Sequence, residues 1–170
     1  MKRYSDLLDD ARRLVTETMP WDLQARLAAA DPPLLLDVRE PQEFALLQIA
    51  GSLNVPRGLL EQACEWDHDV TEPLLVNGRA REIVVLCRSG HRSLLAAATL
   101  RAMGFERVAS LRTGVRGWND AELPLQDGEG RPADADAAEV LLTARLRPDQ
   151  RKPPAGPRTS TDPGWASSSS

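Results

Sequence analysis

Two short, uninterrupted hydrophobic runs mark the chain, and each is closed by a residue that can do chemistry. Residues 34–38 read Leu-Leu-Leu-Asp-Val, and residues 83–87 read Ile-Val-Val-Leu-Cys. Apolar runs without alternation are typical of strands buried on both faces, as in a parallel sheet covered by helices. Residues 108–111 form a weaker third candidate strand. The pattern therefore predicts an α/β protein.

Apolar residues at helical spacing lie between and before these runs. Residues 93–103, which read SLLAAATLRAM, predict a helix that ends at Gly104. Strand, helix and strand in this order form a βαβ unit, for which a right-handed crossover is expected. Two more helices are expected, an amphipathic one over 5–15 and another over 20–30, which ends before two prolines.

The composition changes near the C-terminus. Residues from about 128 onward hold close to half of the 13 prolines, and the chain ends in four serines. One helical pattern, near 136–146, interrupts this stretch. We therefore expect a helical extension over 1–18, a single domain over 19–127, and a flexible Pro/Ser-rich tail over 128–170 that contains the short helix.

Charge and cysteine content exclude several classes of function. The formal net charge of the 170 residues is -4, which gives no general attraction to nucleic acid or to an anionic membrane. Two cysteines make no disulfide framework, and two histidines are too few for a zinc site. No apolar segment is long enough to span a bilayer, and no secretory signal is visible. We expect a cytoplasmic protein without metal or cofactor.

The residues after the second hydrophobic run carry the candidate chemistry. They read Cys87-Arg88-Ser89-Gly90-His91-Arg92-Ser93 and connect a buried strand to a helix. Ligands of open α/β sheets bind beyond the carboxyl ends of the strands, where loop N–H groups and helix N-termini converge. Arg88 and Arg92 add two positive charges, and Gly90 permits a tight backbone path. The segment predicts an anion cradle that favours the thiolate of Cys87.

Such a loop suits nucleophilic catalysis by sulfur. An anionic donor bound there would pass a sulfur atom to Cys87, and the same N–H groups would stabilise the anionic persulfide that forms. The alternative is that Cys87 is a small buried apolar residue. Two arginines and two serines within the next six positions are poor core material, which favours a reactive thiol.

Four segments of the chain resemble the rhodanese family. They are residues 35–44 (LLDVREPQEF), 49–56 (IAGSLNVP), 85–93 (VLCRSGHRS) and 114–118 (GVRGW), in the family's order and spacing. The resemblance implies a rhodanese-like fold, with a five-stranded parallel sheet and helices on both faces, and a single-domain thiosulfate sulfurtransferase. It implies Cys87 as the persulfide-bearing residue, with residues 88–93 around the transferred sulfur. Gln48 stands where many family members have a histidine, so that position cannot titrate here.

Two residues at the end of the first hydrophobic run are candidates for a supporting part. Asp37 and Arg39 are expected at the carboxyl end of their strand, on the same side of the sheet as the cysteine loop. The resemblance suggests that they buttress the loop, and direct substrate contact is the alternative. His91 is expected at the loop rim, facing solvent, rather than as an acid, a base or a metal ligand.

Other residues have a functional reading and a structural one. Cys64 is a resolving thiol or, as we favour, a packing residue of a short helix. Trp118 is expected to anchor the core beneath the loop. Arg112 and Arg116 either widen a positive rim or only solvate a helix end.

Two other functions remain open. Cysteine phosphatases and arsenate reductases of the related fold use Cys-x5-Arg, and here Arg92 comes one position too early, with Ser93 in its place. A non-catalytic rhodanese-like binding module is the third reading, although such modules often lack the cysteine. Expected partners are a small anionic sulfur donor and a thioredoxin-like or sulfur-carrier acceptor, which the proline-rich tail would help to bind.

Overall fold

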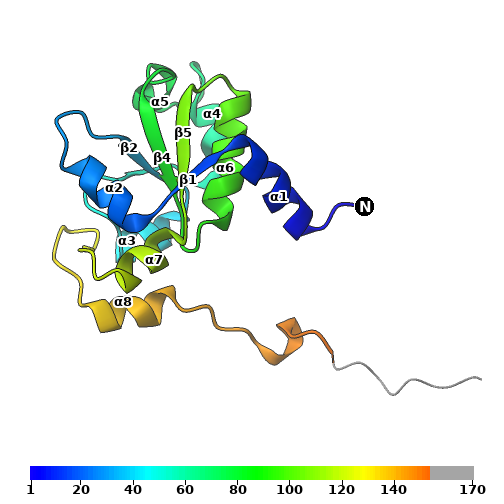
Figure 1. Cartoon of the computed structure of the whole chain (residues 1–170), viewed down its shortest axis with the longest axis vertical. Coiled ribbons are helices and arrows are strands. Elements are labelled where there is room, and N and C mark those ends of the chain that lie inside the picture. The colour runs from blue at the N-terminus through cyan, green and yellow to red at the C-terminus, as the bar shows by residue number, and fades with distance from the viewer. Residues whose placement is uncertain (154–170) are drawn as a thin grey trace, which may run out of the picture.

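A parallel sheet of five strands, in the order β1-β5-β4-β2-β3, forms the centre of the structure, a computed structural model that describes residues 1–153 (Figure 1). The strands are β1 (Thr16–Thr18), β2 (Leu34–Asp37), β3 (Leu53–Asn54), β4 (Glu82–Leu86) and β5 (Arg107–Leu111). Every pairing is parallel. The α/β class and the five-stranded parallel sheet are confirmed.

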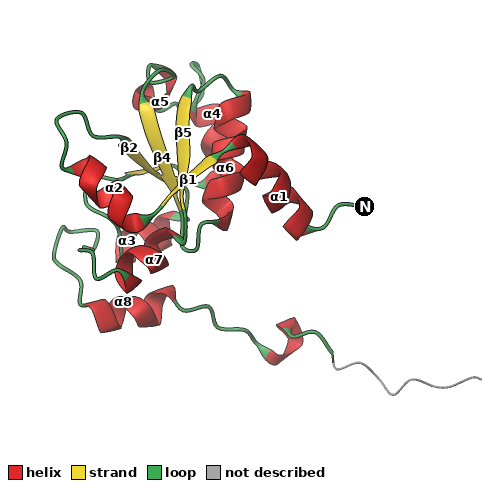
Figure 2. Cartoon of the chain, viewed as in Figure 1, coloured by secondary structure: helices red, strands yellow, loops and turns green. Residues whose placement is uncertain are grey.

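Helices cover both faces of the sheet (Figure 2). The longer ones are α1 (Tyr4–Leu14), α2 (Pro20–Leu27), α6 (His91–Ala102), α7 (Gly114–Asp120) and α8 (Ala135–Leu142). Shorter turns are α3 (Pro41–Leu46), α4 (Leu60–Ala63) and α5 (Pro73–Val76), with 3-10 turns at Arg57–Leu59 and Pro148–Gln150. Within residues 1–153, no helix is long and apolar enough to cross a bilayer.

The residues of each continuous hydrophobic run pack alternately into two separate cores, because successive side chains of a strand point to opposite faces of the sheet. Leu34 and Leu36 of β2 pack in the core beneath α1, α4 and α6, whereas Leu35 packs in the core beneath α2, α7 and α8. All four residues of β2 are buried. Burial on both faces is why no polar position interrupts these runs.

Strand β1 belongs to the sheet although it precedes residue 19, where we expect the domain to begin. Thr16 pairs with Ala109 and Thr18 with Leu111, so the edge strand is formed by residues that we assigned to an N-terminal extension. The polar sequence Thr-Glu-Thr gives no hydrophobic signal, because an edge strand is only partly buried. The sheet therefore begins ahead of residue 19.

Part of the expected tail packs on the domain. The Asp134 side chain accepts a hydrogen bond from Ala137 N at 2.9 Å and caps α8. From α8, Ala138 and Leu142 join the core beneath α7, with exposed fractions of 1% and 3%. The helix ends at Leu142, earlier than the expected 146. Residues 154–170 of the expected tail lie outside the described residues.

We expect Leu142→Ala to lower the free energy of unfolding by about 2–4 kcal/mol, because it leaves a cavity in the core beneath α8. Leu141→Ala is the matched control: its side chain is 51% exposed, so the loss should be about 0.5 kcal/mol or less. Urea unfolding of both variants measures the difference. Equal stability of the two variants would show that α8 is not part of the folded domain.

Candidate active site

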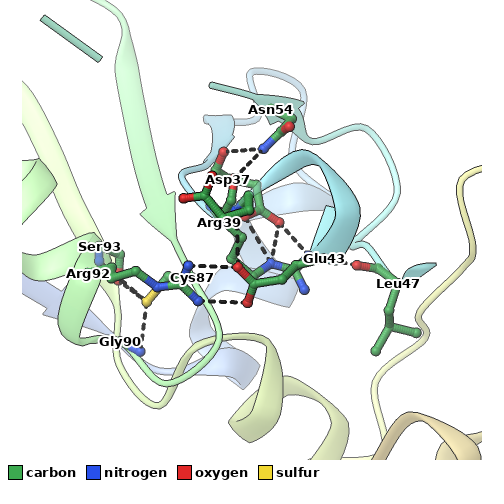
Figure 3. A network of polar contacts seen from close by, with 10 residues as sticks. Asp37, Arg39, Glu43, Leu47, Asn54, Cys87, Gly90, Arg92 and Ser93 are labelled. Carbon is green, nitrogen blue, oxygen red and sulfur yellow. Dashed lines mark hydrogen bonds and ion pairs between the residues drawn. The ribbon is translucent and has the colours of Figure 1, made fainter. Parts of the chain in front are cut away.

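The sulfur of Cys87 lies at the centre of the loop between β4 and α6 (Figure 3). The backbone N–H groups of Gly90 and Ser93 point at Sγ, with N···S distances of 3.2 and 3.4 Å. Cys87 is 1% exposed. Because both donors belong to the backbone at the start of α6, they are fixed in place and carry the positive end of the helix dipole.

A buried pair of hydroxyls completes the surroundings of the sulfur. Ser93 Oγ lies 3.5 Å from Sγ, and Ser110 Oγ donates to Ser93 Oγ at 2.9 Å. Both serines are fully buried. Because the Ser93 oxygen accepts from Ser110, its own hydrogen is free to point at a sulfur anion. Sequence reasoning missed Ser110, and its only signal was a hydroxyl within the short apolar run 108–111.

Two glycines let a second loop press against the first. Gly90 has a φ of +90°, and a Cβ there would lie 3.0 Å from Thr113 N. Gly114 has a φ of +64°, and a Cβ there would collide with the backbone of Cys87 and Arg88. At this approach Val115 N donates to Cys87 O at 2.8 Å and Arg116 N to Arg88 O at 3.0 Å. The 114–118 segment thus holds the cysteine loop through its backbone.

The Arg92 guanidinium binds the carboxylate of Glu43 (Figure 3). Its two terminal nitrogens donate to the Glu43 carboxylate at 2.7 and 2.8 Å. These hydrogen bonds lower the pKa of Glu43 and raise the pKa of Arg92. We had expected Arg92 beside the anion. Glu43 was not singled out from the sequence, since nothing local shows that a residue on α3 reaches α6.

Asp37 and Arg39 form a buried ion pair at the end of β2. Arg39 is 2% exposed, and its Nε and Nη2 donate to the Asp37 carboxylate at 3.0 and 2.6 Å. Arg39 Nη2 also reaches Leu47 O at 2.6 Å, and Asn54 Nδ2 donates to the carbonyls of both members of the pair at 3.0 Å. These bonds tie the end of β2 to the end of α3 and to β3, which is the geometry of a support.

Arg88 is the loop arginine that remains available. It is half-buried, and it makes no ion pair within residues 1–153. Together with Arg39 and Glu43 it lines a cavity of about 70 Å³ whose apolar wall is made by α3 and α8. Ser89 and His91 are exposed. The His91 ring stands edge-on to that of Tyr4, 6.0 Å away, at the rim of the loop.

Within the described residues, the other residues singled out from the sequence make no hydrogen bond with the sulfur of Cys87. Cys64 is fully buried in the core beneath α6, and burial raises the pKa of its thiol to about 11. A thiol with that pKa stays protonated at neutral pH. Trp118 is 2% exposed and donates Nε1–H to Pro124 O at 2.9 Å. Gln48, 9% exposed, pairs with Gln126 through the backbone.

Arg112 and Arg116 are exposed in the turn and helix that follow β5. The backbone of Arg112 donates to Thr18 O at 2.9 Å. Among the described residues, no group of three or more His, Cys, Asp and Glu side chains is placed to hold a metal ion.

Comparison with known proteins gives one consistent family. Residues 19–121 match the model of the rhodanese-like domain. A sulfurtransferase of Allochromatium vinosum is 35% identical over 118 residues, which is 69% of this chain and all of that protein. Thiosulfate sulfurtransferase GlpE of Pseudomonas fluorescens is 28% identical over 109 residues, 64% of this chain and 90% of its own. Two further curated relatives are longer, and the chain spans 40% of one and 20% of the other.

One similar solved structure carries a description that names a different activity. A Rhodopseudomonas palustris protein of unknown function, described as a possible tyrosine phosphatase, superposes with a TM-score of 0.67. It is 29% identical, and the alignment covers 74% of this chain and 96% of that one.

We expect Glu43→Gln to lower the free energy of unfolding by about 1 kcal/mol at neutral pH, since the pair is about one-third exposed and therefore screened. Because Arg92 lowers the pKa of Glu43 from its usual 4.5, this contribution is present above that pH and is lost as the pH falls through the folded value. Denaturant unfolding at about pH 7 and about pH 3 measures the change.

Glu139→Gln is the matched control, since Glu139 is exposed and makes no ion pair within the described residues. It should unfold like the wild type at both pH values. A stability difference between wild type and Glu43→Gln that is the same at both pH values would contradict the pair's contribution.

Proposed function

Because this chain belongs to the rhodanese-like domain family, we propose that it is a sulfurtransferase that moves a sulfane sulfur from thiosulfate, through a persulfide on Cys87, to a thiophilic acceptor. The observation that carries the proposal is the position of Sγ, which faces the N–H groups of Gly90 and Ser93 at the start of α6. These groups favour an anionic sulfur there before and after transfer.

The first half-reaction loads the cysteine. The thiolate of Cys87 attacks the outer sulfur of thiosulfate, and a new S–S bond forms. The S–S bond of the donor breaks and sulfite leaves with its electron pair. The terminal sulfur of the persulfide is then the anion that nearby N–H and guanidinium groups stabilise.

Arg88 is the residue that we assign to donor binding. A dianion such as thiosulfate needs a cation that is not already neutralised, and the Arg92 guanidinium is bound to Glu43. Arg88 is half-buried, directly follows the nucleophile, and has no ion-pair partner in residues 1–153. Partial burial strengthens its interaction with an anion relative to that of a fully exposed arginine.

Phosphate chemistry is the second candidate, favoured by the similar protein described as a possible tyrosine phosphatase. A phosphate cradle needs an arginine that closes over the tetrahedral anion. Here the position after Arg92 holds Ser93, whose side chain is buried against Ser110 and Cys87. A loop one residue shorter suits a single sulfur atom better than three phosphoryl oxygens.

In the second half-reaction, the persulfide passes its outer sulfur to an acceptor, which we assign only to the class of thiophilic nucleophiles. Cyanide serves as an assay acceptor, while a thioredoxin-like protein or a sulfur carrier would present a thiol or thiocarboxylate. The GlpE relative is named for thiosulfate as its sulfur source, and that supports the same donor here.

Incubation with thiosulfate should add one sulfur atom to the intact mass of the protein, and reductant should remove it. Cys87→Ser should show no addition, because the thiol of the loop is gone. Cys64→Ser is the control and should load like the wild type, since the Cys64 thiol is buried and protonated. Loading that follows Cys64, or hydrolysis of an aryl phosphate faster than thiosulfate turnover, would contradict the proposal.

We expect Arg88→Gln to raise the KM for thiosulfate about tenfold, the effect of losing one charge-assisted hydrogen bond to the donor. Arg145→Gln, a change at an exposed arginine of the C-terminal segment, is the control and should leave the KM unchanged. Steady-state thiocyanate formation at varied thiosulfate measures both. An unaltered KM in Arg88→Gln would exclude Arg88 from donor binding.

A further inference from the structure

A polar hollow of about 220 Å³ lies beside the cysteine loop, on the side of α7. Its lining comes from Ser89, Thr113, Arg116, Gly117 and Asp120. It is separate from the smaller cavity next to Arg88, which is walled by α3 and α8. The mechanism above uses none of the side chains of this hollow.

The backbone connects the residues that line the hollow to the loop that surrounds the sulfur of Cys87. Ser89 lies between Arg88, whose carbonyl accepts from Arg116 N at 3.0 Å, and Gly90, whose N–H points at Sγ. Gly117 keeps the wall open, because a Cβ there would collide with the Thr113 side chain. A ligand in the hollow therefore sits next to the groups that hold the sulfur.

Two opposite charges line this hollow, and neither has an ion-pair partner within residues 1–153. Arg116 and Asp120 are one helical turn apart on α7, and both are exposed. Neither forms an ion pair with the other or with any other side chain in residues 1–153. Other exposed charges on the described surface are paired, such as Arg12 with Asp9 and Arg147 with Asp149. A ligand that carries both charges would satisfy both residues.

We propose that the hollow binds the α-amino acid end of a small thiol acceptor, with Arg116 on its carboxylate and Asp120 on its ammonium group. An α-amino acid places these two charges on one carbon, which matches an arginine and an aspartate that face one small hollow. The inference rests on the proposed function, since it names the class of acceptor that discharges the Cys87 persulfide.

The transfer step balances without an added oxidant. The acceptor thiol loses its proton to solvent, and its thiolate attacks the outer sulfur of the persulfide. A new S–S bond forms on the acceptor, and the bond between that sulfur and Sγ breaks with its electron pair left on Sγ. Cys87 returns as a thiolate, and the acceptor leaves as a persulfide.

Three thiols separate the two contacts: cysteine, cysteamine, which lacks the carboxylate, and 3-mercaptopropionate, which lacks the ammonium group. We expect Arg116→Gln to lower kcat/KM about tenfold for cysteine and for 3-mercaptopropionate, but not for cysteamine. Asp120→Asn should lower it by a similar factor for cysteine and cysteamine, but not for 3-mercaptopropionate. The intrinsic reactivity of each thiol cancels, because each is compared with itself between variants.

Arg81→Gln and Asp31→Asn are matched controls. Both residues are exposed and lie near the amino ends of β4 and β2, whereas the cysteine loop follows the carboxyl end of β4. They should leave all three values unchanged. Equal losses for all three thiols in Arg116→Gln or Asp120→Asn, or no loss for any, would overturn the assignment.

S-methylcysteine, which has no free thiol, tests the site apart from the chemistry. Calorimetric or NMR titration should show that it binds the unloaded protein and that Arg116→Gln and Asp120→Asn each weaken its binding about tenfold. Absence of binding to the wild type would refute the site even if Cys87 forms a persulfide. Binding without any persulfide after thiosulfate treatment would instead refute the proposed function alone.

Discussion

Two backbone N–H groups and one buried hydroxyl meet at the sulfur of Cys87, and much of the fold serves to hold them there. The N–H groups are fixed by the first turn of α6, and the hydroxyl of Ser93 is fixed by Ser110 on β5. The turn before α7 then closes on the loop, at a distance that only a glycine at position 114 permits. Preorganised dipoles of this kind need no rearrangement when charge appears on the sulfur.

The charges around the loop are divided between support and binding. The Arg39 guanidinium forms an ion pair with Asp37, and the Arg92 guanidinium forms one with Glu43, so both arginines link segments of the chain. Arg88 keeps an unshared charge within the described residues, at the position next to the nucleophile. A protein with a net charge of -4 can thus attract an anion at one point of its surface.

The sequence showed the parts of the molecule whose signal is local. Runs 34–38 and 83–87 appeared as buried strands because both of their faces are covered, and the cysteine loop stood out because two arginines and two serines follow the cysteine within six positions. The edge strand β1 and the two-residue β3 carry no such signal, and only the family resemblance implied five strands. The partners of Arg92 and Ser93 were missed because Glu43 and Ser110 are brought to them by tertiary packing.

The pairing of β1 with β5 also has a consequence for how the chain reaches this fold. Thr16 meets Ala109, so the edge strand can be placed only after nearly the whole sheet has been synthesised. Until then β1 has no neighbour, and closing so long a loop costs entropy before any contact repays it. Docking of the N-terminal segment is therefore expected to be a late event in folding.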